Sequence, residues 1–404
     1  MTDRQGLAAS AEQHWLNAER LRIYPRIIAA AYLVLLAVQL PTISQNLASH
    51  GNQLGADFMA FWVGGRLALA GQGAQVWNYQ EFLSAQQRFF PDIAGGGYGW
   101  FYPPNYLLAV TPFALLPYLA ALLAFSGLGL GCWWLALKAA IDRPGWGLLA
   151  ITFPGVWVCL VQGQNGLITA ALAAGSLLLL RRRPMVSGVL LGLLAIKPQL
   201  AVVAVIALVA ARAWRTLLLA ALTAVATLAL ALLAFGTASL GSWLGSLQLA
   251  RLATETGTLP GVKMASTFAA LRLLGVDVAW SYVGHAVVAL AAVLALWLIW
   301  HRSDDHSLRA AAVMVATILV TPFSYDYDLV WLGFAIAWYA KYALASGWRR
   351  GDREILLASW LLPGLATTIA LGVHLQVVPL VLAAFLWRIW RRATTSNQQA
   401  VISG

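Results

Sequence analysis

The sequence predicts an all-α, polytopic integral membrane protein, and three observations carry this prediction. The chain has 404 residues, of which 61% are hydrophobic and only 10% are charged, whereas an ordinary soluble chain carries roughly 25% charged residues. Apolar stretches of about twenty residues, the length of a bilayer-spanning helix, recur from residue 24 to residue 390. These stretches are continuous rather than alternating, which excludes a membrane β-barrel.

The same composition excludes several other classes of protein. A soluble enzyme and a disordered scaffold are incompatible with so many long apolar stretches. A disulfide-stapled secreted domain is excluded because the chain has two cysteines, Cys132 and Cys159, and both lie inside apolar segments. No Walker loop, GxGxxG or HExxH motif is present, so the sequence predicts no cofactor and no metal.

Hydropathy predicts about twelve transmembrane helices. They are 24–43, 118–138, 146–161, 164–180, 184–197, 198–211, 214–235, 279–300, 308–322, 327–346, 354–371 and 373–391. The fifth and sixth are too short to cross a bilayer at right angles, and a re-entrant pair would leave the topology unchanged. We expect residues 1–23 to be a cytoplasmic segment, 24–392 a single transmembrane domain, and 393–404 a disordered cytoplasmic tail.

The basic residues predict how these helices are oriented. The net charge is +11, and with the amino terminus in the cytoplasm 20 of the 26 Lys and Arg residues fall in seven cytoplasmic groups. This bias favours cytoplasmic positions for both termini, and it makes the basic clusters topology signals rather than a site for nucleic acid. External loops 1 and 4, residues 44–117 and 236–278, are then long. In loop 1, residues 57–70 and 106–116 form amphipathic stretches that can lie on the membrane surface or dip into it.

Polar residues that gather at the external ends of the predicted helices form the candidate site. Polar groups at membrane depth are costly, so their gathering favours a shared polar cavity, although loop ends are also where polar residues ordinarily lie. The candidate substrate-binding residues are Lys197, Arg66, Tyr102, Gln164, Asn165, Lys263, Arg272, Tyr325 and Asp326.

Asp57 is the candidate catalytic residue. It precedes an apolar, helix-like stretch at the predicted water–lipid boundary. A carboxylate in this position can take a proton from an acceptor hydroxyl while the hydroxyl oxygen attacks a sugar carbon. The alternative is an N-cap of the following helix, a role that Asp fills well, and spacing alone does not separate the two.

Four cations are candidates for binding a phosphate group. Lys197 is followed by Pro198 and is either a snorkelling lysine or a cation that stabilises a lipid phosphate as a leaving group. Lys263, Arg272 and Arg66 compete for the second role. The lone His374 is more typical of a structural residue.

The other candidates also have two interpretations. Gln162, Gln164 and Asn165 can bind sugar hydroxyls or satisfy backbone groups at two adjacent helix ends. Tyr102 belongs to a stiff Tyr-Pro-Pro element that favours a structural role. The run Ser324-Tyr325-Asp326-Tyr327-Asp328 begins an apolar helix, which its carboxylates can cap, but the same carboxylates can also contact substrate or a divalent cation.

Four ordered blocks carry a resemblance to a known family. They are DFMAFWVGGRLALAG, FYPPNYLLAVTPFALLPYLAAL, VQGQNGLITAALAAGSLLLLRRRPMVSGVLLGLLAIKPQL and TPFSYDYDLVWL. In this order they resemble glycosyltransferase family 87, multi-pass GT-C enzymes that include polyprenol-phosphate-mannose-dependent α-mannosyltransferases and related arabinofuranosyltransferases. The resemblance implies a GT-C-like fold with a catalytic pocket at the outer membrane face. It places Asp57 at the position of the family's catalytic base.

The resemblance implies a hexosyltransferase that moves a mannosyl-like unit from a polyprenyl-phosphate donor to a glycolipid or envelope-glycan hydroxyl. We expect it in the bacterial plasma (inner) membrane, with membrane lipids as neighbours, no nucleic acid partner and the active site on the outer, periplasmic face. One departure is the absence of a His from residues 324–328, which leaves the donor sugar open. The rival function is a transporter or flippase of lipid-linked glycans, but the predicted helices carry almost no charge, which favours an enzyme working on one face.

Overall fold

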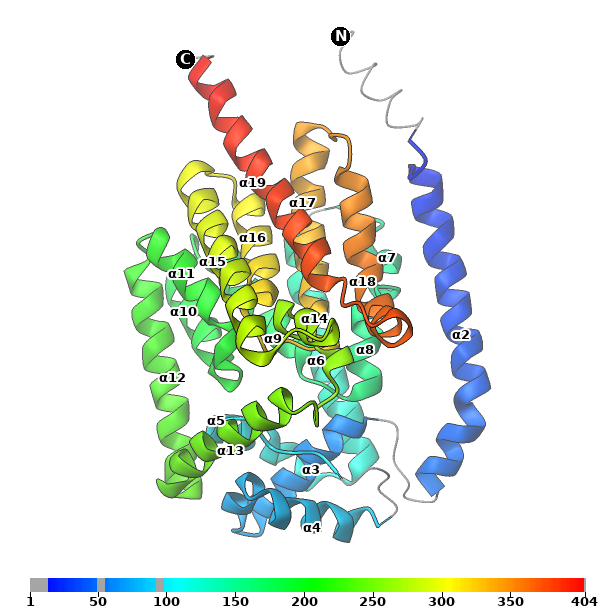
Figure 1. The fold of residues 1–404 in the computed structure, drawn as a ribbon, viewed down its shortest axis with the longest axis vertical. Helices are drawn as coiled ribbons and strands as arrows, with labels where there is room; N and C mark the ends of the chain where they lie inside the picture. Colours follow the sequence, from blue (N-terminus) through cyan, green and yellow to red (C-terminus); the bar gives the residue numbers. More distant parts are fainter. Residues whose placement is uncertain (1–13, 49–54, 92–96, 142, 403–404) are drawn as a thin grey trace.

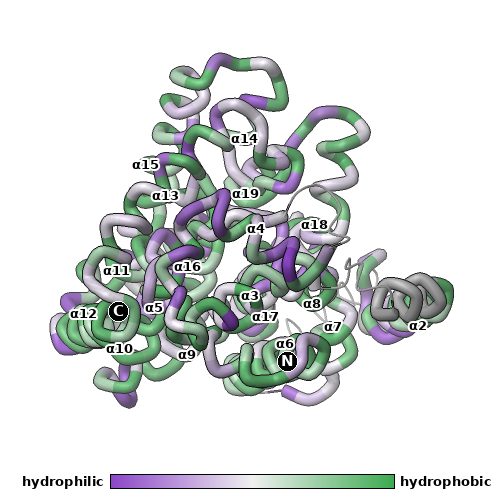
Figure 2. The backbone as a smooth tube through the Cα atoms, turned by 90° about the horizontal axis from the view of Figure 1, so that it is seen from below, coloured by the Kyte–Doolittle hydropathy of each residue, from purple (hydrophilic) through white to green (hydrophobic). Residues whose placement is uncertain are grey.

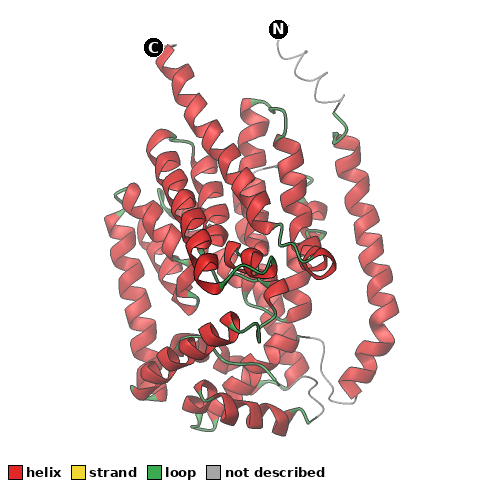
Figure 3. Ribbon diagram, in the orientation of Figure 1, coloured by secondary structure: helices red, strands yellow, loops and turns green. Residues whose placement is uncertain are grey.

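The computed structural model describes residues 14–48, 55–91, 97–141 and 143–402. Within these ranges every regular element is a helix, as Figures 1 and 3 show. The predicted all-helical class is therefore confirmed for the described part of the chain. Ala18, at the start of α2 (Ala18–Ala48), and the end of α19 (Val378–Ile402) lie at the same end of the molecule.

Six helices in the described ranges are long and apolar enough to cross a membrane. They are α2, α6 (Tyr118–Ala140), α12 (Trp214–Phe235), α15 (Val278–Arg302), the continuous η6 (Asp326–Trp331) and α17 (Leu332–Ser346), and α18 (Asp352–Val373). Four shorter apolar helices accompany them, and two of these are α9 (Gly166–Leu179) and α16 (His306–Val320). The structure thus shows a polytopic membrane protein but does not confirm twelve spans.

Two of the predicted spans differ in the structure for identifiable reasons. Residues 146–161 form two helices, α7 (Gly147–Ile151) and α8 (Pro154–Gln162), because Pro154 has no backbone N–H to continue a helix and is well suited to begin one. At the other end of the chain, α19 is longer than predicted and extends to Ile402, into the segment for which the sequence predicts disorder.

The fifth and sixth predicted spans form a short helical hairpin. One arm is α10 (Pro184–Leu193) with η3 (Leu194–Ile196), and the other is η4 (Pro198–Leu200) with α11 (Val202–Ala210). Each arm is about 20 Å long at 1.5 Å per residue, less than the roughly 30 Å of a bilayer core. This geometry favours the re-entrant alternative, with Lys197 at the tip of the hairpin.

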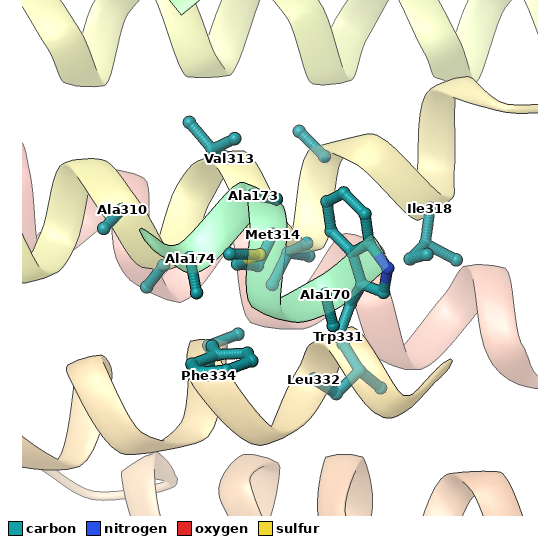
Figure 4. Close-up of a cluster of buried hydrophobic side chains, with 14 of the residues drawn as sticks. Ala170, Ala173, Ala174, Ala310, Val313, Met314, Ile318, Trp331, Leu332 and Phe334 are labelled. Atoms are coloured by element: carbon teal, nitrogen blue, oxygen red, sulfur yellow. The ribbon is translucent and has the colours of Figure 1, made fainter. Parts of the chain in front are cut away.

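The core of the bundle is built around α16, in which 12 of the 15 residues are buried. Figure 4 shows small residues of α9, Ala170, Ala173 and Ala174, beside Met314 of α16 and Trp331 of η6. Small side chains allow helix backbones to approach closely, which is a main source of attraction between helices in a membrane. By contrast, α2 and α12 expose large apolar side chains along their length, as helices that face lipid do.

The predicted external loops are helical. Most of their helices lie at the lower end of Figure 1, whereas residues 261–273 lie nearer the middle of the molecule. Loop 1 contains α3 (Ala56–Leu69), η1 (Gly73–Trp77), α4 (Tyr79–Phe89), α5 (Pro104–Val110) and η2 (Thr111–Leu115), and loop 4 contains α13 (Ala238–Glu255), η5 (Gly261–Lys263) and α14 (Thr267–Leu273). Viewed from this end, Figure 2 shows hydrophilic stretches on α4, whereas α12 is mainly hydrophobic.

Helix α3 packs against other parts of the protein. Most of it is buried, and Phe61 is surrounded by the rings of Trp100, Tyr102 and Tyr106 at centroid distances of 6.0, 5.4 and 5.0 Å. Edge-to-face aromatic pairs of this kind contribute packing energy beyond their buried area. The start of α3 is therefore held rigidly inside the protein.

Candidate active site

The first turn of α3 positions Asp57. The helix is preceded by Gly55, whose left-handed backbone (φ 68°) directs the chain into the helix and whose N–H donates to the carbonyl of Val161 at 2.9 Å. The hydroxyl of Tyr118 donates to the carbonyl of Gly55 at 3.0 Å. Because Gly55 is the N-cap, the interpretation of Asp57 as the N-cap is wrong, and its carboxylate is available for other contacts.

The carboxylate of Asp57 is bound by Gln164. The Nε2 of Gln164 donates to Oδ2 of Asp57 at 2.7 Å, while Oε1 of Gln164 accepts from the Tyr102 hydroxyl at 3.3 Å and from the Asn165 N–H at 3.2 Å. These two donors orient the amide so that its nitrogen faces Asp57. Within the described ranges Oδ1 of Asp57 accepts no hydrogen bond from the protein.

Two glycines allow the turn between α8 and α9 to lie between Asp57 and η6. Gly163 ends α8 in a left-handed conformation (φ 66°), and a Cβ there would lie 2.6 Å from Cβ of Phe58. A Cβ on Gly166 would lie 2.5 Å from the carbonyl oxygen of Tyr327. Contacts this short are impossible for any residue with a side chain, so the Gly-Gln-Asn-Gly sequence is a packing requirement at two close approaches.

The same turn also binds a second carboxylate. Gln162 donates from Nε2 to both oxygens of Asp326, at 3.3 and 3.2 Å. Asp326 also accepts from the hydroxyl of Thr367 at 3.3 Å and from the N–H of Tyr327 at 2.9 Å. The α8–α9 turn thus links Asp57 on one side to Asp326 on the other.

Lys197 forms a buried ion pair. Its Nζ lies 2.7 Å from Oδ1 of Asp328, with only 6% and 1% of the two side chains exposed, and 4.6 Å from the centroid of the Tyr327 ring. The other oxygen of Asp328 accepts from the N–H of Tyr325 at 3.1 Å, so Asp328 also caps its own turn. Lys197 does not snorkel toward water, and its charge is already compensated by Asp328.

Lys263 is the cation of this region that has no carboxylate partner among the described residues. Its segment is held by an antiparallel bridge between Met264 and Tyr325 and by Nε2 of Gln376, which donates to the carbonyl of Met264 at 2.9 Å. Lys263 is half-buried and close enough for its charge to act on both Asp57 and Asp326. Among the described residues it forms no ion pair within 4.0 Å.

Burial raises the pKa of Asp57 above its ordinary value. The hydrogen bond from Gln164 and the charge of Lys263 act in the opposite direction, and the charge of Asp326 adds to the rise. A carboxylate whose pKa is raised in this way is a stronger base than an exposed aspartate, which is what proton abstraction near neutral pH requires.

Three residues singled out by the sequence are not brought into this network. Arg66 is exposed and lies nine residues beyond Asp57 on α3, about 13 Å along the helix axis. Arg272 donates to the carbonyls of Val276 and Glu255, at 2.8 and 3.4 Å, and so closes the end of α14. His374 is exposed and ends α18.

Tyr325 and two further residues, Asp328 and Thr367, also contribute to this network. The rings of Tyr325 and Tyr327 stack at a centroid distance of 5.6 Å. Asp328 was not identified as the partner of Lys197, although a lysine predicted at membrane depth, in a chain with only 15 carboxylates, requires a counterion. Thr367, which donates to Asp326, lies in an apolar helix and gave no signal in the sequence.

The fold is that of a polytopic helical membrane protein, and its candidate site pairs carboxamides with carboxylates. The model of glycosyltransferase family 87 matches residues 100–322, more than half of the chain. The chain belongs to glycosyltransferase family 87, as the resemblance implied, and is therefore a membrane glycosyltransferase. The match includes Gln164, Lys197 and Lys263, whereas Asp57 and Asp326 lie outside it. No curated protein and no solved structure matches, so the GT-C-like architecture stays a prediction.

Proposed function

We propose that the protein transfers a hexosyl unit from a polyprenyl-phosphate donor to a hydroxyl acceptor, with Asp57 as the general base. The observation that carries the proposal is the state of the Asp57 carboxylate. One oxygen is held by Gln164 at 2.7 Å, its pKa is raised by burial, and its other oxygen accepts no hydrogen bond from the described residues. An oriented carboxylate with one free oxygen can accept a proton without prior rearrangement.

In the proposed reaction the acceptor hydroxyl approaches Oδ1 of Asp57 and attacks the anomeric carbon of the donor sugar. The O–H bond breaks and its proton passes to Asp57, while a new C–O bond forms on the face of the sugar opposite to the phosphate. The bond between the anomeric carbon and the phosphate oxygen breaks with its electron pair, and polyprenyl phosphate leaves. A single displacement of this kind inverts the anomeric configuration.

We assign stabilisation of the leaving phosphate to Lys263 rather than to Lys197. The charge of Lys197 is compensated at 2.7 Å by Asp328 in a buried pair, and breaking such a pair to bind a ligand is unfavourable. Lys263 has no carboxylate within 4.0 Å among the described residues and lies near Asp57. A cation in this position stabilises the negative charge that develops on the departing oxygen.

The carboxamides and tyrosines of the network are proposed to bind the sugar and the acceptor. Gln164, Asn165, Tyr102 and Tyr325 offer both donors and acceptors to hydroxyl groups. A mannosyl-like donor, a glycolipid or envelope-glycan acceptor, and action on the outer face of a bacterial plasma membrane are parts of the same proposal. They rest on the family and on the distribution of basic residues.

The test is transfer in vitro by the purified full-length protein, with polyprenyl-phosphate mannose or arabinose as donor and a panel of lipid acceptors. Asp57→Asn should reduce transfer at least about 1,000-fold, because an amide cannot accept the proton, while donor binding stays within about twofold. The matched control is Asp277→Asn. Asp277 caps α15 by accepting from the N–H of Ala279 at 2.8 Å, which Asn also does well. Full transfer by Asp57→Asn, or an equal loss in Asp277→Asn, would contradict the proposal.

A further inference from the structure

A basic cavity lies at the opposite end of the bundle, where the α9–α10, α11–α12 and α15–α16 connections meet. Its volume is about 710 Å³. Figure 1 shows the α15–α16 connection at the upper end, away from α3 and α4. Four arginines line the cavity: Arg181, Arg212, Arg215 and Arg309.

The four arginines come from three parts of the chain and line one cavity. Arg181, Arg212 and Arg215 are exposed, so their side chains remain available to a ligand. Arg212 has a left-handed backbone (φ 53°), a conformation that glycine adopts with less strain. An arginine at such a position is unfavourable for folding alone, which favours a role for its side chain in binding.

Arg309 is the cavity arginine whose side chain is held in place by other residues. Its guanidinium donates to the carbonyl of Trp300 at 2.7 Å and to Oδ1 of Asp304 at 3.0 Å, and it lies 5.5 Å from the Trp300 ring. Asp304, which is almost fully exposed, compensates Arg309 alone among the described residues, and Asp305 caps α16 by accepting from the N–H of Leu308 at 2.9 Å. Positive charge therefore predominates inside the cavity.

An apolar track leads away from the cavity along α12. Trp214, which lines the cavity, is exposed, and so are Leu218, Leu222 and Val225. Steps of four, four and three residues place these side chains on one face of the helix. A basic cavity for a headgroup that continues into an apolar track for a chain matches the shape of a phospholipid.

We infer that this cavity binds the phosphate headgroup of an anionic phospholipid, with an acyl chain along the apolar track of α12. Arginine guanidinium groups bind phosphate through paired hydrogen bonds, and basic pockets between membrane helices are typical sites for anionic headgroups. A soluble phosphate compound uses the arginines equally well but leaves the apolar track unoccupied. The site is independent of the proposed transfer reaction, because it shares no residue with the network around Asp57.

The test measures lipid binding to the purified full-length protein in neutral detergent, with phosphatidylglycerol and phosphatidylcholine as the two lipids and native mass spectrometry as the readout. Phosphatidylglycerol should bind preferentially. Arg212→Gln/Arg215→Gln should weaken that binding about 25-fold, at roughly fivefold for each charge near the headgroup. The control is Lys138→Gln/Arg143→Gln, which removes two exposed charges from residues that do not line the cavity, and it should bind as the unchanged protein does.

A charge-preserving variant distinguishes a loss of lipid binding from a failure of membrane insertion. Arg212→Lys/Arg215→Lys retains the topology signal but not the planar, paired hydrogen bonds of arginine, and it should lose several-fold in affinity. Equal binding of the two lipids, or an equal loss in the Lys138/Arg143 control, would show that the arginines are only a topology signal. Displacement of the lipid by inorganic phosphate at the same concentration would assign the cavity to a soluble phosphate compound and overturn the inference.

Discussion

The buried ion pair between Lys197 and Asp328 leads to a prediction with a clear magnitude. Both side chains are almost completely buried, and their charged atoms lie 2.7 Å apart. Removal of either partner leaves the other as an uncompensated buried charge, which costs about 3–5 kcal/mol of stability. Lys197→Met and Asp328→Asn should therefore each destabilise the protein by about that amount.

The double variant distinguishes an ion pair from two independent effects. In Lys197→Met/Asp328→Asn no buried charge remains, and Asn can still accept from the N–H of Tyr325, as Asp328 does at 3.1 Å. The double variant should thus be more stable than either single variant, with a coupling energy of at least about 3 kcal/mol. If the two charges acted separately, the two losses would add.

The assay is equilibrium unfolding of the purified protein in mixed micelles. The matched control is the Arg251–Glu255 pair on α13, which has the same N–O distance of 2.7 Å but is largely exposed at Arg251, so that Arg251→Met/Glu255→Gln should change stability far less. A loss below about 1 kcal/mol in Lys197→Met, with additive effects in the double variant, would refute the reasoning. It would also return Lys197 to the list of cations available to a phosphate.

Four further predictions concern the candidate active site and its turn. The transfer rate should fall as the pH drops through the pKa of Asp57, which burial keeps above its ordinary value of 3.8, because only the charged carboxylate accepts a proton. Lys263→Gln should move this acid limb to higher pH, since a charge that lowers the pKa of Asp57 is removed; an unmoved limb in the pH–rate profile would count against the pairing. Gln164→Leu should lower kcat/KM roughly 10- to 100-fold, the value of a hydrogen bond to a charged group, and unchanged kinetics would exclude Gln164 from orienting the base. Gly166→Ala should destabilise the protein by about 1–3 kcal/mol, because its Cβ would lie 2.5 Å from a carbonyl oxygen, while Gly131→Ala, whose Cβ would meet no atom within 4 Å, should be neutral in thermal unfolding.

The helical class and the gathering of polar residues could be predicted from the sequence because both depend on local composition. Continuous apolar stretches predict helices in a membrane. Because successive helices end on alternate faces of the membrane, Gln164, Lys197 and the Asp326 segment are predicted on the same face. Asp57 and Gln164, which are in contact, were predicted separately, Asp57 as a base and Gln164 as a residue that binds sugar hydroxyls. Hydropathy is therefore sufficient to predict which part of the chain forms the candidate site.

The partners within that region could not be predicted from the sequence. Lys197 and Asp328 are separated by 131 residues, and their pairing depends on how the α10–α11 hairpin packs against η6. The burial of α3 could not be predicted because the apolar pattern of a single helix does not include Trp100 and Tyr106, whose rings pack against Phe61. Twelve spans are not confirmed, because several of the predicted spans form helices too short to meet the length of a bilayer crossing.

The separation of Lys197 from its counterion also has a consequence for how the protein is made. Asp328 is synthesised 131 residues after Lys197, a delay of roughly 7–26 s at a translation rate of about 5–20 residues per second. During this interval Asp328 cannot compensate the lysine, and a lysine without its buried partner is unfavourable in a hydrocarbon environment. We therefore expect the hairpin to reach its final position late in biogenesis, after the segment that carries Asp328 has been inserted.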